Sequence, residues 1–195
     1  GPGQPVRDRI AGADELSGGG CGGGRCIGMP ALLALLAPSQ YQARAELAFR
    51  SIASQLSALL PRTRIEHVGA SSIPGAISKG DLDICVLVAS SHHQTTVDAL
   101  EGLGYVIKTD TLRTPELCML VSPRKDMDVA LQVVSEGSRF EFFLHFRDRL
   151  RAEPRLVAQY NQLKRRFAPS GPERYRRAKD RFIQRVIGSP QAPQS

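Results

Sequence analysis

The sequence lacks the motifs that identify several common classes of enzyme. It contains no Walker phosphate-binding loop, no G-x-G-x-x-G turn between a predicted strand and a helix, and no Ser, His and Asp in a triad order. P-loop kinases, Rossmann-fold enzymes and triad hydrolases are therefore disfavoured. No apolar run is long enough to cross a bilayer, and the short apolar stretch 31–37 lacks the flanks of a signal peptide. We therefore expect no membrane partner.

Cysteine is also scarce, and its positions limit what it can do. Cys21 and Cys26 lie in a glycine tract, and because no second spaced pair exists, a structural zinc site is excluded. Cys85 and Cys118 lie inside apolar runs and are predicted to be buried small residues. This pattern suits a reducing compartment, so we expect a cytoplasmic location.

The chain does contain an excess of positive charge. Its formal net charge is +7 and its pI is about 9.6. Residues 139–185 hold 14 Lys or Arg against 5 Asp or Glu, so most of the charge lies near the C-terminus. An anionic partner such as a nucleoside triphosphate, RNA or an acidic surface is indicated. The alternative is a basic protein that has no polyanionic partner.

The length and the glycine content suggest one folded domain with a tail at each end. Residues 1–28 are rich in glycine and are predicted to be disordered, because glycine loses much entropy on ordering. Residues 29–187 are predicted to form the domain, with a core over about 38–137 and a helical extension over about 138–187. A disordered tail is expected over 188–195.

The periodicity of apolar residues predicts an α/β (α+β) core. One helix is expected to begin at Ser39 as its N-cap and to end before Pro61, and a second is expected to be capped by Ser90 and Ser91. Strands are predicted at 64–68, 81–88, 105–107, 117–122 and 127–134, and later helices at 140–150, 154–167 and 173–187. Two of these strands are joined by a hairpin and are therefore antiparallel, which predicts a mixed sheet.

The stretch 65–88 organises the chain, and its first half is a turn of small residues. The apolar strand at 64–68 ends at Gly69, which is followed by Ala70, Ser71 and Ser72. Small residues let the backbone approach a phosphate group closely, and exposed N–H groups and hydroxyls can then bind it. Gly69, Ser71 and Ser72 are therefore predicted to bind phosphate.

The second half of this stretch carries two acids, Asp81 and Asp83, at the start of a predicted strand. Alternation along a strand points both carboxylates to one face, where they repel each other unless a divalent cation lies between them. A magnesium or manganese site is the prediction. The alternative is a strand that merely begins with acids. Lys79 would either bind phosphate or offset the two acids.

These features resemble the signature of the DNA polymerase β-like nucleotidyltransferase superfamily, in which a Gly-Ser turn precedes an acid–apolar–acid triplet. Over about residues 38–187 the chain is similar more specifically to the GrpB family, which shows an I-E-H-V-G-S-T-S-V-P-G run. The matching residues are Ile65, Glu66, His67, Val68, Gly69, Ser72, Pro74 and Gly75. The serine that usually follows the glycine is Ala70 here, which moves phosphate contact to Ser71, Ser72 or the backbone.

The resemblance implies a third acid on a neighbouring strand. Asp128 is the first choice and Asp126 the second, and the alternative for both is a charged hairpin mouth. Many GrpB-like chains carry histidines at two positions where this chain has Ala130 and Gln132, so any role that those histidines have in the family is not provided by these positions here. We expect His67 to pack at a strand end.

Two residues of the last predicted helix, Tyr175 and Lys179, are one turn apart and face the same way. Lys179 would reach an anion, and Tyr175 would stack or hydrogen-bond within a substrate cleft. The alternative is a basic helix that is solvated outside and packs through Phe182 and Ile183.

The resemblance implies a nucleotidyltransferase that uses magnesium or manganese. Asp81, Asp83 and Asp128 would hold the metals, and a nucleotidyl group would pass from a nucleoside triphosphate to an acceptor hydroxyl on a small molecule, RNA or protein. The alternatives are a non-catalytic nucleotide- or RNA-binding module, suggested by Ala70 and the missing histidines, and a regulatory partner protein with an exposed apolar patch.

Overall fold

A computed structural model describes residues 33–188 of the chain. The predictions for residues 1–28, including Cys21 and Cys26, and for the tail from residue 189 onward lie outside the described residues. Gly188, which was assigned to that tail, is the last residue of a helix. No helix between residues 33 and 188 has both the length and the hydropathy to cross a bilayer.

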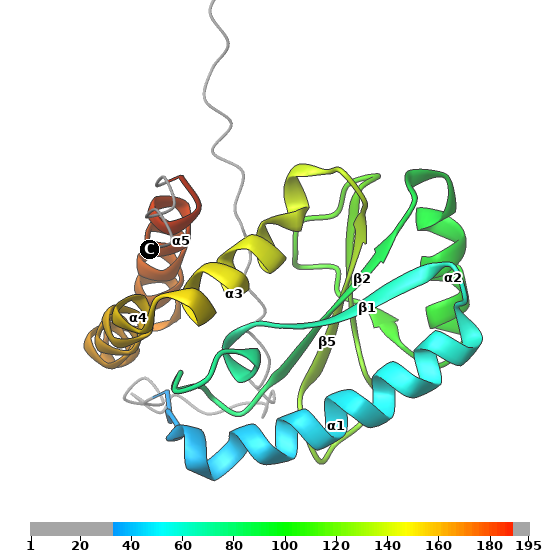
Figure 1. Cartoon of the computed structure of the whole chain (residues 1–195). Helices are drawn as coiled ribbons and strands as arrows, with labels where there is room; N and C mark the ends of the chain where they lie inside the picture. Colours follow the sequence, from blue (N-terminus) through cyan, green and yellow to red (C-terminus); the bar gives the residue numbers. More distant parts are fainter. Residues whose placement is uncertain (1–32, 189–195) are drawn as a thin grey trace, which may run out of the picture.

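The centre of the structure is a five-stranded mixed sheet, as predicted (Figure 1). Its strands are β1 (Thr63–Val68), β2 (Leu82–Val88), β3 (Val106–Ile107), β4 (Leu117–Val121) and β5 (Val129–Ser135), in the order β1-β2-β5-β4-β3. β2 pairs with β5 in parallel, and the other three pairings are antiparallel. Strand β2, which carries the acidic stretch at its start, lies next to the central strand β5, and every residue of β2 is buried.

Two helices, α1 (Pro38–Leu59) and α2 (His93–Gly102), cover one face of the sheet. The apolar side chains between them and the strands form one core cluster, which includes Ile52, Leu56, Val97, Leu100, Ile84, Val86 and Leu131. Alternation along β2 explains this arrangement, because Leu82, Ile84, Val86 and Val88 all point to this side.

Three later helices, α3 (Phe142–Ala152), α4 (Pro154–Phe167) and α5 (Pro172–Gly188), pack together against the other face (Figure 1). Their contact is aromatic: the ring of Tyr160 stacks on that of Phe182 at 5.2 Å, and Phe146 meets Tyr160 edge-on at 5.4 Å. Cys85 and Leu87 of β2 face this second cluster. Cys85 and Cys118 are buried free thiols, as predicted.

The predicted helix caps are wrong in two places. The N-cap of α1 is Ala37 rather than Ser39, because Pro38 already adopts the first helical position, where proline is favourable. The side chain of Gln40 then accepts a hydrogen bond from the Ala37 N–H at 2.7 Å. Ser90 and Ser91 lie in a 3-10 turn, η2 (Ser90–His92), and α2 begins only at His93.

Candidate active site

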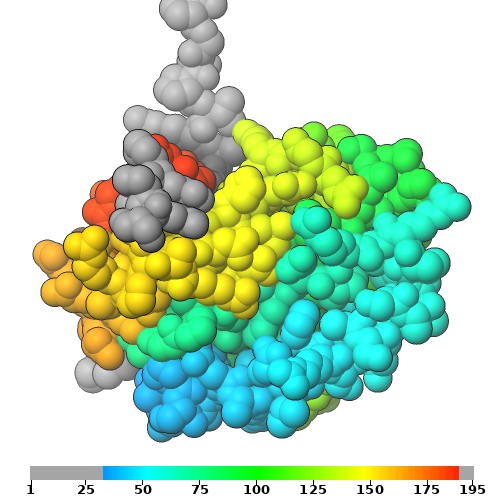
Figure 2. All heavy atoms as spheres, in the orientation of Figure 1, coloured from blue at the N-terminus to red at the C-terminus, as the bar shows by residue number. Residues whose placement is uncertain are grey.

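The segment after β1 forms a tight turn between α1 and the helices of the opposite layer (Figure 2). Gly69 has a φ of 71°, which favours glycine, and it opens the 3-10 turn η1 (Ala70–Ser72). The hydroxyl of Ser72 donates to the carbonyl of Gly69 at 2.7 Å. The first N–H groups of such a turn have no acceptor inside the turn, so the turn offers donors to an anion.

The turn lies directly against one of the two acids. Val68, the last residue of β1, pairs with Asp83 of β2. A β-carbon on residue 69 would overlap Oδ2 of Asp83 and lie 2.9 Å from its Cβ. Glycine is therefore required here for two reasons, its backbone angle and the closeness of the carboxylate.

Asp81 and Asp83 are both buried, with exposed fractions of 8% and 7%. Asp81 precedes β2 rather than beginning it, and its Oδ1 accepts a hydrogen bond from the Ser78 hydroxyl at 2.6 Å. Oδ1 of Asp83 accepts a longer bond, of 3.4 Å, from Nε2 of Gln132 on β5. Two buried carboxylates separated by one residue provide hard oxygen donors of the kind that magnesium binds.

The predicted third acid lies at the same edge of the sheet, because β2 and β5 run in parallel. Strand β5 begins only at Val129, so Asp126 and Asp128 are exposed loop residues and not strand residues as predicted. The carbonyl of Asp128 accepts a hydrogen bond from the Leu82 N–H at 2.9 Å, which joins this loop to the start of β2. Within residues 33–188, no three His, Cys, Asp or Glu side chains are gathered closely enough to hold a metal ion together.

Asp126 is engaged by arginines. Nη2 of Arg124 donates to it at 2.8 Å and Nε at 3.0 Å, and Arg44 lies 3.9 Å away. The hydrogen bond from Arg124 lowers the pKa of the Asp126 carboxyl to about 2. These ion pairs favour Asp128 over Asp126 as the available acid.

Asp81 and Asp128 line one cavity of about 270 Å³ between the start of α1 and the loop before β5. Lys79 also lines it, so this predicted phosphate-binding cation lies on the same side as the two acids. Asp83 does not line this cavity and lies instead at Gly69 and Gln132. The cavity mixes both signs of charge, and its remaining lining residues are Leu36, Gln40, Tyr41, Arg44, Gly80, Lys125, Asp126 and Met127.

The loop between the turn and the acids is held by α4. The side chain of Asn161 accepts from the Ile77 N–H at 2.9 Å and donates to the Gly75 carbonyl at 2.8 Å. Nζ of Lys164, a residue only 1% exposed, donates to the Ile77 carbonyl at 2.6 Å. Sequence reasoning missed the roles of both Asn161 and Lys164. In the sequence, a lysine among arginines gives no sign that it is buried.

Tyr175 and Lys179 of α5 are buried, and Nζ of Lys179 lies 5.4 Å from the centre of the Tyr175 ring. The predicted facing of the two side chains is confirmed. Both are on the inner side of α5 with Phe182 and Ile183, so Lys179 is not part of the solvated face of the helix.

A hydrogen-bonded chain behind the turn was also missed. Nδ1 of His67 donates to Oε2 of Glu46 at 3.2 Å, and Nε2 lies 3.0 Å from the hydroxyl of Ser71. The ring stacks on Phe49, with 4.7 Å between ring centres. Burial lowers the pKa of His67, and the bond to Glu46 only partly opposes this. Nε2 of the neutral imidazole then accepts a hydrogen bond from the Ser71 hydroxyl, which fixes Ser71 in the turn.

Two arginines of α3 contact the same turn. Nη1 of Arg147 donates to the His67 carbonyl at 2.9 Å, and Nε of Arg151 donates to the Ser72 carbonyl at 2.9 Å. Burial, together with the charge of Arg147, lowers the pKa of Arg151. An arginine therefore lies at the Ser72 end of the turn, where it favours an anionic ligand, while the Asp83 carboxylate lies against Gly69.

Comparison with known proteins agrees with this architecture. The family model described as GrpB protein matches residues 38–189. A UPF0157 protein of Vibrio cholerae is 52% identical over 149 residues, which are 76% of this chain and 79% of that protein. A UPF0157 protein of Halalkalibacterium halodurans is 34% identical over 130 residues, 64% of this chain and 65% of the relative.

Among solved structures, the crystal structure of conserved protein GrpB from Enterococcus faecalis matches with a TM-score of 0.63 at 22% identity. The match covers 80% of this chain and 95% of that one, and it shows a shared fold. The Cid1 poly(U) polymerase matches with a TM-score of only 0.44 at 16% identity, over 63% of this chain and 39% of that chain. A likeness of this size supports no inference about activity.

Proposed function

The chain belongs to the GrpB family, and from the geometry of the turn at Gly69 and the neighbouring aspartates we propose that the protein is a metal-dependent nucleotidyltransferase. It would transfer a nucleotidyl group from a nucleoside triphosphate to an acceptor hydroxyl on a small molecule, an RNA or a protein. A cytoplasmic location, where such triphosphates are made and used, is part of the proposal.

The observation that carries the proposal is the contact between Gly69 and Asp83. A glycine with a φ of 71° opens a turn rich in backbone donors, and the same glycine lies against a buried carboxylate. A triphosphate bound at the turn would therefore have its phosphates beside that carboxylate. Two like charges so placed require a cation between them.

The donor set fits magnesium or manganese. Magnesium in proteins is usually bound by one or two carboxylates, with water and substrate phosphate oxygens completing the shell. Asp81 and Asp83 would be those ligands, and Asp128 would join them from the loop before β5. When bound, the metal supplies charge that stabilises the phosphoryl oxygens and the leaving group.

The other residues of the chain would bind and orient the reactants. Gly69, Ser71 and Ser72 would bind the β- and γ-phosphates chiefly through the first backbone N–H groups of the turn, because both serine hydroxyls already donate within the protein. Lys79 would add positive charge. The acceptor oxygen forms a bond to the α-phosphorus, the bond to the bridging oxygen breaks, and pyrophosphate leaves. Asp128 would accept the proton of the acceptor hydroxyl.

The inner side of α5 would complete the cleft. Tyr175 would stack on the base or hydrogen-bond within the cleft, and Lys179 would contact an anionic group of the substrate. Both side chains are buried and lie within 5.4 Å of each other, so they are held in a fixed relation.

Calorimetry with ATP and magnesium tests the proposal. We expect the native protein to bind ATP only with the metal, and Asp83→Asn to weaken binding at least about tenfold, since it removes a charged ligand. Asp126→Asn is the matched control, because it removes an exposed acid that arginines already engage, and it should bind within about twofold of the native protein. Equal binding by the native protein and Asp83→Asn would contradict the proposed site.

A second candidate is a non-catalytic nucleotide-binding module on the same fold. It is favoured by the absence of a gathered group of three metal-binding side chains among residues 33–188. Two measurements distinguish the candidates. A binding module would retain its nucleotide affinity in EDTA, and it would release no pyrophosphate with any acceptor.

A further inference from the structure

The charge of the protein is concentrated on two helices. Helices α4 and α5 contain ten Lys or Arg and two Asp or Glu, a net charge of +8. The whole chain carries +7, so everything outside these helices sums to −1. The basic character of the protein is therefore a property of these two helices and not of the whole molecule.

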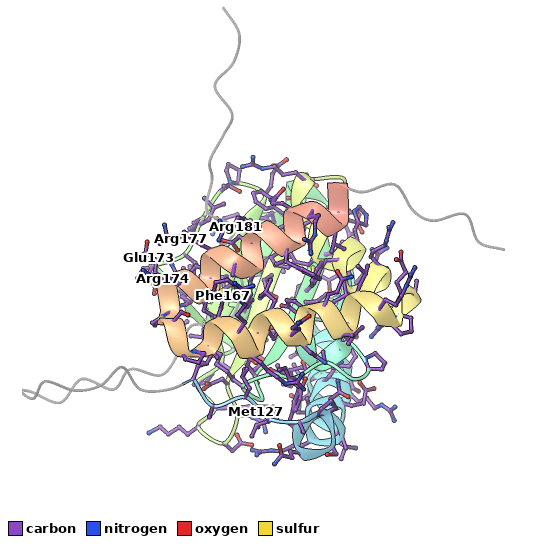
Figure 3. All side chains as sticks on the ribbon, turned by 90° about the vertical axis from the view of Figure 1, so that its left-hand side faces the viewer. Met127, Phe167, Glu173, Arg174, Arg177 and Arg181 are labelled. Carbon is purple, nitrogen blue, oxygen red and sulfur yellow. The ribbon has the colours of Figure 1, made fainter. Side chains whose placement is uncertain are left out.

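Most of this charge points outward. Figure 3 shows Arg174, Arg177 and Arg181 in a row along α5. We define the basic face as the arginines of α4 and α5 that are exposed: Arg155, Arg165, Arg166, Arg174, Arg177, Arg181 and Arg185. The two lysines of these helices, Lys164 and Lys179, are buried and therefore do not belong to the basic face.

Helices α4 and α5 contain too few acids to neutralise the basic face. Arg177 and Glu173 form an ion pair at 3.7 Å, but their side chains are 64% and 79% exposed. An ion pair this exposed is worth little and is readily exchanged for another anion. The only other acid of the two helices, Asp180, has its pKa raised by burial and lies beside Lys179.

The chemistry of the face selects among polyanions. All seven of its cations are arginines, whose planar guanidinium groups bind phosphate oxygens in pairs. A lipid surface would also require exposed apolar side chains to insert, but within the described residues the exposed large hydrophobic residues, Leu47, Leu59, Leu103 and Val106, lie outside α4 and α5. The face is thus suited to a regularly spaced row of phosphates.

The face also contains an aromatic position. The guanidinium of Arg166 lies 5.5 Å from the centre of the half-buried Phe167 ring. Arginine and aromatic planes of this kind can stack on unpaired bases, which a single strand exposes and a duplex hides. This favours a single strand over a duplex.

The basic face is attached to the candidate active site. Arg165 and Arg166 follow directly after Lys164, whose Nζ donates to the Ile77 carbonyl in the loop between the turn and the acids. We propose that the basic face binds a single polynucleotide strand through its phosphates. Resting on the proposed function, this strand is the acceptor, and its terminal hydroxyl reaches the site of Asp83.

Fluorescence anisotropy with a labelled 20-nucleotide oligouridine tests the binding, with oligothymidine as a second arm to distinguish RNA from DNA. The measurement is made in EDTA without nucleotide, so it does not depend on the proposed transfer reaction. We expect affinity to fall steeply between 50 and 200 mM salt, with the slope proportional to the number of phosphate contacts. Binding in EDTA together with failure of transfer would keep the face and remove only the proposed function.

Two matched variants locate the surface. Arg174→Ala/Arg181→Ala removes two arginines of the basic face, and Arg62→Ala/Arg113→Ala removes two exposed arginines outside α4 and α5. We expect the first to weaken binding about tenfold and to reduce the logarithmic salt slope by about 1.4, and the second to change binding less than twofold. Equal loss in both variants, no binding at 50 mM salt, or binding only to phosphatidylserine vesicles would overturn the proposal. Circular dichroism checks that each variant is folded.

Discussion

Nη1 of Arg147 lies 2.7 Å from Oε2 of Glu66, and the same nitrogen donates to the carbonyl of His67. This arginine therefore joins α3 to β1 at His67, two residues before the turn opens at Gly69. The guanidinium is largely buried, with its side chain 10% exposed, while that of Glu66 is 29% exposed. The position of the turn thus depends on a charge pair between the sheet and the helical layer.

Arg147→Met is expected to lower the free energy of unfolding by about 2–3 kcal/mol, because it removes the donor from Oε2 of Glu66 and from the buried His67 carbonyl. Urea unfolding measures this change. Arg64→Met is the matched control, since Arg64 contacts the same Glu66 at 3.4 Å but has a side chain 57% exposed. That variant should lose less than about 1 kcal/mol. Similar losses in both variants would show that the pair between Arg147 and Glu66 contributes no more to stability than the exposed pair between Arg64 and Glu66.

Gly69→Ala tests the contact on which the proposed function depends. The new methyl group must displace the Asp83 carboxylate, and its backbone must keep a φ of 71°. We expect a loss of about 2–4 kcal/mol in stability, from backbone strain and overpacking together. Binding of ATP with magnesium, measured by calorimetry, should be lost as well.

Gly137→Ala separates the two causes. Gly137 has a φ of 76°, close to that of Gly69, but a β-carbon there would meet nothing within 4 Å. This control should cost only the backbone strain, about 1 kcal/mol, and should leave nucleotide binding unchanged. If Gly69→Ala behaved like Gly137→Ala, the closeness of the turn to Asp83 would have no functional meaning.

Much of the fold could be predicted from local patterns. The nearly continuous apolar run at 82–88 and the hairpin before β5 are short-range signals, and together they led correctly to a mixed sheet. The start of β5 was placed too early, because Met127 is buried like a strand residue while the chain around it is still a loop. Burial and strand pairing are different properties, and sequence alone shows only the first.

The candidate site was less predictable, because its supports come from distant parts of the chain. Asn161 and Lys164 bond to a loop more than eighty residues earlier, and Glu46 reaches His67 from another helix. Such contacts depend on how the layers pack and leave no spacing to read. His67 was expected only to pack at a strand end, which its stacking on Phe49 confirms, but its bond to Ser71 was not foreseen.

Cys85 should be inert in the folded protein. Burial raises the pKa of its thiol to about 12, so at pH 8 only about one molecule in ten thousand carries the reactive thiolate. We expect iodoacetamide to modify Cys85 and the buried Cys118 only when the protein unfolds. Peptide mass mapping of each cysteine before and after addition of guanidinium measures this. Labelling of Cys85 within minutes in native buffer would show that the β2 face opens readily.

His67 should make stability depend on pH in the window from about pH 6.5 downward, to the lowered pKa of the folded protein. Burial holds its pKa below the ordinary 6.5, and the hydrogen bond to Glu46 only partly offsets this, while Arg147 and Arg151 add to the depression. The unfolded chain therefore binds a proton at a pH where the folded chain does not. The contribution of His67 is fully present above pH 6.5 and is lost as pH falls toward the lowered pKa.

His67→Gln should remove this dependence. Urea unfolding at a series of pH values is expected to give a shallower decline for His67→Gln than for the native protein over this window, even though the variant starts less stable. Glu46 does not interfere, because its own pKa is lowered from 4.5 and its contribution is lost only below that pH. His145→Gln, at an exposed position of α3, should leave the slope unchanged. Parallel curves for the native protein and His67→Gln would contradict this prediction. They would mean that His67 takes up its proton equally in the folded and unfolded states, and that the hydrogen bonds to Glu46 and Ser71 do not keep its ring neutral.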